Sequence, residues 1–239
     1  QQRMSSKWRN ESFETITNHP GVHYPTKLGL ELIASQFKDE ITDFVGYHHF
    51  EHEGEVISSD GYGQLILNRT PFYGESGGQK GDVGEINFNN KTVKVLDTLR
   101  AGNLLLHVID VTKDLKPGQR VFAKIDVSRR LSIMRNHTAT HLVHEALRRV
   151  LGEHLHQHGS LVDDKHLRFD FNHFDKVSPE QLHAIEDLVN EKISGKIKVQ
   201  ALNDPKEWVS IDEAKKRWPN VKMFFGDKYG DKVRVVEID

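Results

Sequence analysis

Apolar residues recur along the chain with two different periods. Near the beginning, four of them follow helical spacing and predict a helix over 27–37, namely Leu28, Leu32, Ile33 and Phe37. From about residue 41 to 127 the pattern changes to short apolar runs separated by turns, at 63–67, 83–88, 92–96, 103–109 and 120–125. Asn89-Asn90 and the segment 116–119 are suited to hairpin connections between such runs. Strands at this spacing predict a small antiparallel barrel.

After this region the helical period returns. A long helix is predicted over 128–151, with Gly152 just beyond it as a stop signal. The stretch 167–171 alternates apolar and polar residues, which predicts a half-buried strand.

Capping signals predict a second long helix. Ser178 precedes Pro179 and is followed by Gln181 three residues after the cap, a pattern typical of a helix start. This helix should run to Ile193 and end at Gly195, because glycine readily terminates a helix.

The last part of the chain mixes helix and strand signals. Ser210 with Glu213 repeats the capping signal and predicts a shorter helix. The stretches 221–225 and 232–238 predict a hairpin around 228–231. The sequence therefore predicts an α+β fold in three parts, with a lead-in segment over 1–39, a β-barrel over 40–127 and an α+β domain over 128–239.

Composition narrows the functional classes. The 239 residues include 36% hydrophobic and 28% charged residues, and no run approaches the ~20 apolar residues of a membrane span. No apolar signal core follows the N-terminus and there is no cysteine, so we expect a cytoplasmic protein without disulfides or thiolate metal ligands in these residues.

The net charge of −2 does not suggest a nucleic-acid partner, but the charge distribution does. Between 120 and 150, two acidic residues accompany seven basic ones, namely Arg120, Lys124, Arg129, Arg130, Arg135, Arg148 and Arg149. Such a cluster can bind phosphates, and it can equally be the solvated face of a helix.

Two histidines carry the clearest chemical signal. His137 and His141 are four residues apart on a predicted helix, so their imidazoles share one face and can bind one metal ion. The glutamate of the His-Glu-x-x-His protease motif is replaced by Thr138, which argues against that class. His144 lies about 10 Å along the axis from His137 and is expected to pack nearby rather than bind the same ion. A purely structural role for the pair is an open alternative at this point.

A glycine-rich segment over 70–84 is the second candidate. Five glycines fall within its last eleven residues, which indicates tight turns or a close approach by another molecule. No Gly-Lys-Ser/Thr follows, so it is not a nucleotide P-loop. A hairpin between barrel strands would explain the glycines equally well.

Long motifs separate these alternatives. The chain contains Thr70-Pro71-Phe72-Tyr73-x-Glu75-Ser76-Gly77-Gly78-Gln79, then Gly81-Asp82, then Arg135-x-His137-Thr138-Ala139-Thr140-His141-Leu142. Further matches follow at 157–162, 167–171 and 225–236. In this order they resemble the editing domain of alanyl-tRNA synthetases and its free-standing relatives, from about residue 41 to 239. Residues 1–39 carry no resemblance that we can name.

The resemblance implies a translation-factor-like barrel followed by an α+β editing core that binds zinc. His137 and His141 would be two of the zinc ligands, and a Cys-x-x-x-His motif, expected beyond Asp239, would supply the others. Within residues 1–239 we therefore expect an incomplete site that binds zinc weakly, with both histidines facing the loop that carries Thr70 and Gln79.

The implied function is hydrolysis of Ser-tRNA(Ala) and Gly-tRNA(Ala), with Thr70 and Gln79 as the catalytic-site candidates. Arg129, Arg130 and Arg135 are expected to contact the tRNA acceptor end. The parent enzyme would ligate alanine to tRNA(Ala) with ATP, so the rest of the synthetase chain is an expected partner, and no membrane is involved. The alternatives are an editing domain of the threonyl-tRNA synthetase type and a tRNA-binding module without catalysis.

Overall fold

The computed structural model describes residues 21–219, 221 and 231–238 and divides into two compact units. The first unit comprises residues 1–135 together with 161–166, and the second comprises 136–160 together with 167–239. Within the described residues, a barrel of strands and several helices confirm the predicted α+β class.

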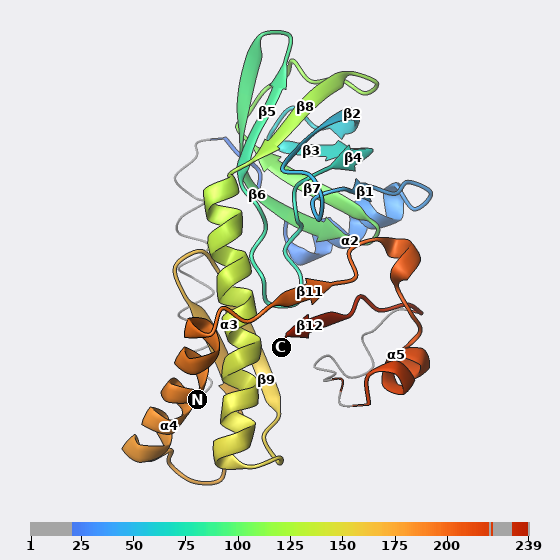
Figure 1. Ribbon diagram of the computed structural model, residues 1–239. Coiled ribbons are helices and arrows are strands. Elements are labelled where there is room, and N and C mark those ends of the chain that lie inside the picture. Colours follow the sequence, from blue (N-terminus) through green and yellow to red (C-terminus); the bar gives the residue numbers. More distant parts are fainter. Residues whose placement is uncertain (1–20, 220, 222–230, 239) are drawn as a thin grey trace. The chain divides into compact units, whose positions relative to one another are not determined.

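Six strands of the first unit close into an antiparallel barrel in the order β2-β3-β7-β6-β5-β8 (Figure 1). The strands are β2 (Glu51–Ser59), β3 (Gln64–Leu67), β5 (Gly84–Phe88), β6 (Lys91–Ala101), β7 (Leu104–Ile109) and β8 (Arg120–Ile125). Five of them confirm the predicted runs. β2 was missed because its outward positions are glutamates, which hide the short apolar alternation around Val56.

The two predicted hairpin connections had different outcomes. Asn89 and Asn90 adopt φ angles of 46° and 59° and join the paired strands β5 and β6, as predicted. Residues 116–119 do form a turn, with the Gln119 N–H donating to the Lys116 carbonyl at 3.1 Å. The strands on either side of it, β7 and β8, are not paired, so the hairpin prediction there was wrong. β7 already has β3 and β6 as neighbours, and β8 has β5 and β2.

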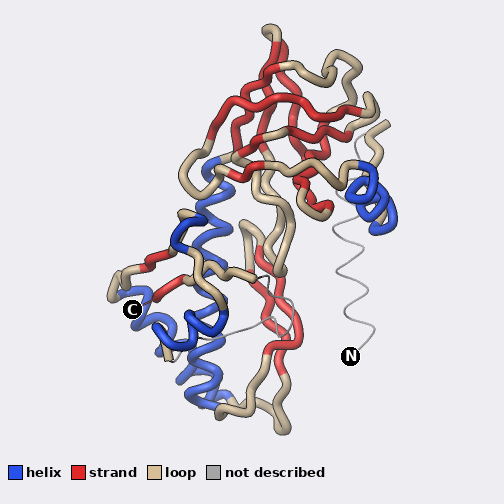
Figure 2. Tube along the Cα trace, turned by 90° about the vertical axis from the view of Figure 1, so that its right-hand side faces the viewer, coloured by secondary structure: helices blue, strands red, loops and turns tan. Residues whose placement is uncertain are grey.

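Apolar side chains fill the barrel interior, and a helix covers one outer face. The interior cluster contains residues from all six barrel strands, with Leu65, Leu67, Phe72, Ile86, Val121 and Ile125 among its members. All six residues of β7 are buried, because Leu104 and Leu106 on its outer side pack with Ile33 and Phe37 of the lead-in segment. The helix concerned, α2 (Lys27–Gln36), was predicted over 27–37 and lies beside the barrel strands (Figure 2).

A second, two-stranded pairing completes the barrel unit. β1 (Asp43–Phe44) runs parallel to β4 (Arg69–Thr70), and the Val45 N–H donates to the Thr70 carbonyl at 3.0 Å. The chain just after the lead-in segment is thus paired with the strand that precedes the glycine-rich segment.

The long helix α3 (Val127–Leu151) begins in the first unit and continues into the second. Gly152, with φ of 111°, ends it as predicted. β9 (Gln157–Val162), whose last two residues belong to the first unit, pairs with β10 (Leu167–Phe171), and α4 of the second unit spans Pro179–Ser194. Their shared core contains Ala146, Leu147, Leu151, Leu155 and Ile185, with Phe169 and Phe171 of β10 packed against it.

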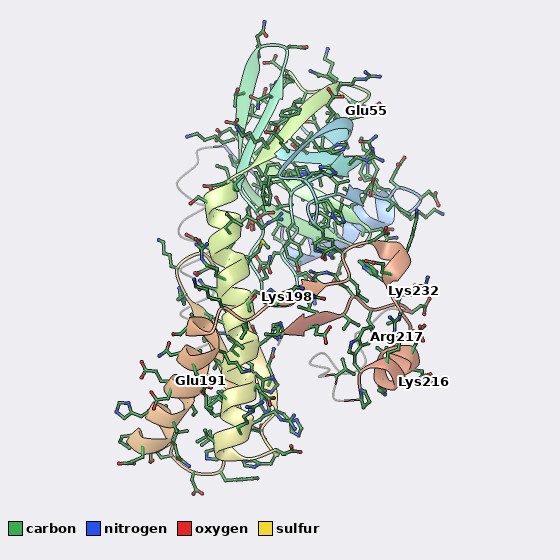
Figure 3. The ribbon with its side chains drawn as sticks, viewed as in Figure 1. Glu55, Glu191, Lys198, Lys216, Arg217 and Lys232 are labelled. Atoms are coloured by element: carbon green, nitrogen blue, oxygen red, sulfur yellow. The ribbon has the colours of Figure 1, made fainter. Side chains whose placement is uncertain are left out.

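The helix starts predicted from capping are confirmed. The Ser178 hydroxyl accepts from the Gln181 N–H at 3.2 Å, and the Gln181 side chain accepts from the Ser178 N–H at 2.9 Å. Ser210 caps α5 (Ile211–Arg217) with its hydroxyl in the same way, and Lys216 and Arg217 lie at the end of that helix (Figure 3).

Residues 222–230, which are half of the predicted hairpin over 221–238, lie outside the described residues. Its last part forms β12 (Val236–Ile238), which pairs antiparallel with β11 (Val199–Ala201), and a 3-10 turn spans Pro205–Glu207. No helix among the described residues is long and apolar enough to cross a membrane.

Candidate functional site

The glycine-rich segment leads from β4 to β5 and contains a tight hairpin. Ser76 and Gln79 exchange backbone hydrogen bonds of 3.2 and 3.0 Å. Between them, Gly77 and Gly78 adopt φ angles of 60° and 84°, which L side chains rarely tolerate. We call residues 75–82 the glycine hairpin.

The other glycines of this segment are explained by close packing against the barrel. A Cβ added at Gly81 would lie 2.0 Å from the Thr98 carbonyl oxygen, and one at Gly84 would lie 2.2 Å from the Lys124 carbonyl oxygen. These contacts are far shorter than any real Cβ makes, so only glycine fits. The close approach inferred from the glycine content is thus made, at these positions, by the protein's own strands.

Thr70 lies inside the barrel at the start of this segment and is fully buried. Its Oγ1 is 2.8 Å from Nε2 of His107 and also accepts from the Phe72 N–H at 3.2 Å. The other ring nitrogen of His107, Nδ1, is 3.1 Å from the Leu65 carbonyl oxygen, which can only accept. Nδ1 therefore carries the proton, and Nε2 accepts from the Thr70 hydroxyl. Burial lowers the pKa of His107 to about 4, so the ring is neutral at physiological pH.

Gln79 is 7% exposed and lies in the second strand of the glycine hairpin. Its backbone forms a parallel bridge with Val162. The Val162 N–H donates to the Gly78 carbonyl at 2.8 Å, and the Val162 carbonyl accepts from the Lys80 N–H at 3.0 Å. An ion pair of 3.0 Å between Lys80 and Glu75 connects the two strands of the hairpin. The backbone around Gln79 is thus held by hydrogen bonds on both sides.

A buried ion pair fixes the end of the hairpin to the start of α3. Both Nε and Nη2 of Arg130 donate to the Asp82 carboxylate, with Nε at 2.9 and 3.0 Å from its two oxygens. Nη1 and Nη2 donate to the carbonyls of Gly46 and Pro71 at 2.7 and 2.9 Å. Asp82 accepts in addition from the Tyr73 N–H at 2.7 Å.

This pair changes how the basic segment is interpreted. Arg130 is 4% exposed and its donors point at protein acceptors, so a direct phosphate contact by Arg130 does not fit the structure. Arg129 is half-buried and pairs with Asp164 at 3.3 Å while donating to the Gly81 carbonyl. Arg135 is exposed and donates to the Ser132 hydroxyl at 2.9 Å. Arg135 is therefore the most accessible of the three candidates.

The remaining basic residues of the segment also have acidic neighbours. Arg148 and Arg149 pair with Glu153 and Glu145. In the barrel, Arg120 of β8 lies opposite Glu55 of β2, which Figure 3 labels, and Lys124 has glutamates opposite it on both adjacent strands. Counting charges along the sequence missed the barrel neighbours because they come from other strands.

His137 and His141 lie on α3 in the second unit, with ring centroids 5.1 Å apart and planes 25° apart. Burial lowers the pKa of His137 to about 4, and His141 and Arg234 act in the same direction. Burial also lowers the pKa of His141. Both rings are therefore neutral near pH 7, which is the form that binds metals. His144 is buried against Phe169 at 4.9 Å between ring centroids, which agrees with the packing role expected for it.

The histidine pair matches half of a zinc site. Two neutral imidazoles one helical turn apart are a common pair of zinc ligands, and a tetrahedral site needs two more. Among the described residues, no group of three or more histidine, cysteine or carboxylate side chains is arranged to hold a metal ion. The residues thus fit zinc as a partial ligand set, and zinc binding stays a prediction.

The site candidates fall into two groups. Thr70, Gln79 and the arginines belong to the barrel unit, and the histidine pair belongs to the second unit. The expectation that the histidines face the glycine hairpin stays a prediction. Sequence reasoning missed the roles of Asp82 and His107, although the Gly-Asp step within the recognised motif was a signal for the first.

Comparison with known proteins agrees with the motifs. A family model described as "tRNA synthetases class II (A)" matches residues 2–129, more than half of the chain. The match includes the lead-in segment, for which the sequence had suggested no assignment. Fold, motifs and this match together define part of a class II tRNA synthetase.

The more specific affiliation comes from individual relatives. Alanine–tRNA ligase of Fusobacterium nucleatum is 43% identical over 217 residues, which cover 88% of this chain and 24% of that protein. The corresponding enzyme of Methylacidiphilum infernorum is 46% identical over 200 residues (82% and 21%). That of Acetivibrio thermocellus is 44% identical over 224 residues (88% and 25%). The chain belongs to the alanyl-tRNA synthetase family, and it spans about a quarter of the length of these relatives.

Proposed function

We propose that this chain is the editing region of an alanyl-tRNA synthetase and that it hydrolyses the ester of Ser-tRNA(Ala) and Gly-tRNA(Ala). The observation that carries the proposal is the pair of partly buried, neutral imidazoles of His137 and His141 on one face of α3. The parent enzyme, as the name of its relatives says, would ligate alanine to tRNA, and we expect it to use ATP in the cytoplasm.

Alanine is difficult to select in a single binding step. Glycine lacks one methyl group, which is worth only about 1 to 3 kcal/mol, and an apolar pocket rejects the extra hydroxyl of serine weakly. A second, hydrolytic site can select serine over alanine with polar groups that hydrogen-bond the serine hydroxyl. These groups stay unpaired when alanine enters, which disfavours its binding.

Gln79 is the residue on which this selectivity is based. Its amide offers both donors and an acceptor, and the hydrogen-bonded glycine hairpin fixes its backbone. The hydroxyl hydrogen of Thr70 is directed at His107, so Thr70 can offer a substrate only a lone pair, and only if the site uncovers it.

His137 and His141 would hold zinc together with the Cys-x-x-x-His ligands expected beyond Asp239. When bound, zinc polarises a carbonyl or lowers the pKa of a bound water, and either effect promotes ester hydrolysis. The protein's own contribution is to keep both imidazoles deprotonated by burial, so that their lone pairs are available without a proton first being displaced.

Arg135 and Arg129 are the proposed contacts to the phosphates of the tRNA acceptor end. Arg135 is exposed, and the ion pair of Arg129 with Asp164 is solvent-accessible enough to be exchanged for a phosphate. Affinity should therefore fall with salt, and Arg135→Ala should reduce the slope of log affinity against log salt by about one unit.

The test uses a chain extended through the Cys-x-x-x-His motif and loaded with zinc. We expect rapid deacylation of Ser-tRNA(Ala), slower deacylation of Gly-tRNA(Ala), and sparing of Ala-tRNA(Ala). His141→Ala should abolish the activity, and Gln79→Ala should reduce the seryl rate with little change in melting temperature. His158→Ala, at an exposed histidine of the same unit as His141, is the control.

Several results would contradict the proposal. Equal rates on seryl and alanyl esters would remove the selectivity, and preference for Ser-tRNA(Thr) would indicate the threonyl type. An extended, zinc-loaded chain that binds tRNA without hydrolysing any of these esters would be a binding module. Zinc that stays on the 239-residue chain through dialysis against a mild chelator would contradict the expected division of the ligands.

A further inference from the structure

The segment before α2 reaches across the barrel to a buried carboxylate on β6. The Tyr24 hydroxyl donates to Oδ2 of Asp97, which lies 73 residues later in the sequence. The same segment is tied to the barrel at His23, whose N–H donates to the Tyr62 carbonyl at 3.0 Å and whose ring stacks on Tyr62 at 5.3 Å. The position of Tyr24 is thus fixed by its own hydroxyl and by the contacts of the residue before it.

Asp97 occupies an irregular point of β6, where the register with β7 shifts between Val95 and Asp97. Its side chain is largely buried, and Oδ1 accepts from the Thr98 N–H at 2.7 Å. A carboxylate in this position needs hydrogen-bond donors to offset its lost hydration, and Tyr24 and Thr98 supply them.

Thr98, next to Asp97, holds both ends of the glycine hairpin. Its carbonyl accepts from the Glu75 N–H at 2.8 Å, and its hydroxyl donates to the Asp82 carbonyl at 2.9 Å. The hairpin also lies directly against the carboxylate, because a Cβ added at Gly81 would be 2.6 Å from Oδ1 of Asp97. A shift of Asp97 would therefore move the surface on which the hairpin rests.

We propose that Tyr24 is a positioning residue for the editing site, which acts through Asp97 and Thr98 to hold the glycine hairpin and with it Gln79. This inference rests on the proposed editing function. It also gives the segment before α2 a role in the site, although that segment is distant from the hairpin in sequence. This role requires no contact between Tyr24 and the substrate.

Charged groups of the hairpin make the arrangement sensitive to pH. Burial raises the pKa of Asp97, the nearby Glu75 carboxylate raises it further, and the Tyr24 hydroxyl, the Thr98 N–H and the charge of Lys80 lower it. Removal of the Tyr24 hydroxyl should therefore raise the pKa of Asp97. A protonated Asp97 no longer attracts Lys80, the residue next to Gln79.

The experiment compares Tyr24→Phe with Tyr62→Phe in the full-length, zinc-loaded synthetase. Tyr62 is the matched control, because it is a half-exposed tyrosine that contacts the same segment through its ring. For Tyr24→Phe we expect kcat for Ser-tRNA(Ala) deacylation to fall about tenfold at unchanged KM, which corresponds to about 1.4 kcal/mol. The acid limb of its pH profile should move to higher pH. In an Asp97→Asn background, Tyr24→Phe should cause no further change, because the carboxylate through which Tyr24 acts is gone.

Amide hydrogen exchange of residues 75–82 supplies a readout that does not need activity. Exchange there should be faster in Tyr24→Phe than in Tyr62→Phe. Unchanged kinetics, pH profile and exchange in Tyr24→Phe would overturn the inference. If the wild-type enzyme shows no deacylation, the editing function is refuted. In that case, unaltered exchange of residues 75–82 in Tyr24→Phe would independently refute the positioning role of Tyr24.

Discussion

Replacement of Arg130 by alanine should remove a large part of the stability of the barrel unit. The side chain is buried and makes hydrogen bonds to the Asp82 carboxylate and to the carbonyls of Gly46 and Pro71. After Arg130→Ala, Asp82 keeps the Tyr73 N–H as a donor but loses its counter-charge while it remains buried.

The magnitude follows from that arrangement. Removal of one partner from a buried ion pair costs about 3 to 5 kcal/mol, because the other charge stays desolvated. Total stabilities of domains are only about 5 to 15 kcal/mol. At roughly 2 to 4 °C per kcal/mol for a unit of this size, the melting temperature should fall by about 6 to 20 °C. Arg130→Lys should recover only part of this loss, since an ammonium group cannot reproduce the planar fork.

The assay is urea and thermal unfolding, followed by far-UV circular dichroism, with Arg135→Ala as the matched control. Arg135 lies on the same helix, is exposed and donates to the hydroxyl of Ser132, its neighbour on that helix, so its loss should change stability by less than about 0.5 kcal/mol. If Arg130→Ala unfolds at the same urea concentration as Arg135→Ala, the structural role assigned to the buried pair is wrong.

Three further outcomes are expected. Burial lowers the pKa of His107 from 6.5 to about 4, so the unfolded chain binds more protons than the folded chain between these pH values. Stability should therefore fall as the pH drops from about 6.5 to 4. His107→Gln should reduce this pH dependence in urea unfolding. Gly81→Ala should lower the free energy of unfolding by more than about 2 kcal/mol, because the added Cβ clashes with the Thr98 carbonyl. Gly29→Ala, whose added Cβ makes only ordinary contacts in α2, should raise it by about 0.5 to 1 kcal/mol. Equal melting temperatures of the two variants would contradict this expectation. Ser178→Ala should cost about 1 kcal/mol by thermal unfolding, and no loss would show that the capping box contributes nothing.

Much of the fold could be predicted because its signals are local. The alternating runs of the barrel strands, the glycine after α3 and the capping box at Ser178 each act over a few residues, so the sequence displays them directly. The four-residue spacing of His137 and His141 is of the same kind, since a helix places such residues on one face wherever it lies.

The failures have one physical cause. β2 was missed because two of its glutamates are accommodated in a strand by lying opposite the lysine and arginine of β8. The sequence does not show which strands will be neighbours. The hairpin expected at 116–119 failed for the same reason, since the closure of the barrel decides that β7 and β8 do not pair.

The arginines illustrate the division most clearly. The sequence by itself determined that α3 would carry a cluster of positive charge beside two histidines. Only the tertiary structure decided that Arg130 is buried against Asp82, 48 residues away, while Arg135 stays exposed on the same helix. Helical periodicity places a side chain on a face, but the free energy of a charge depends on which distant groups replace its water, and that is set by how the chain packs.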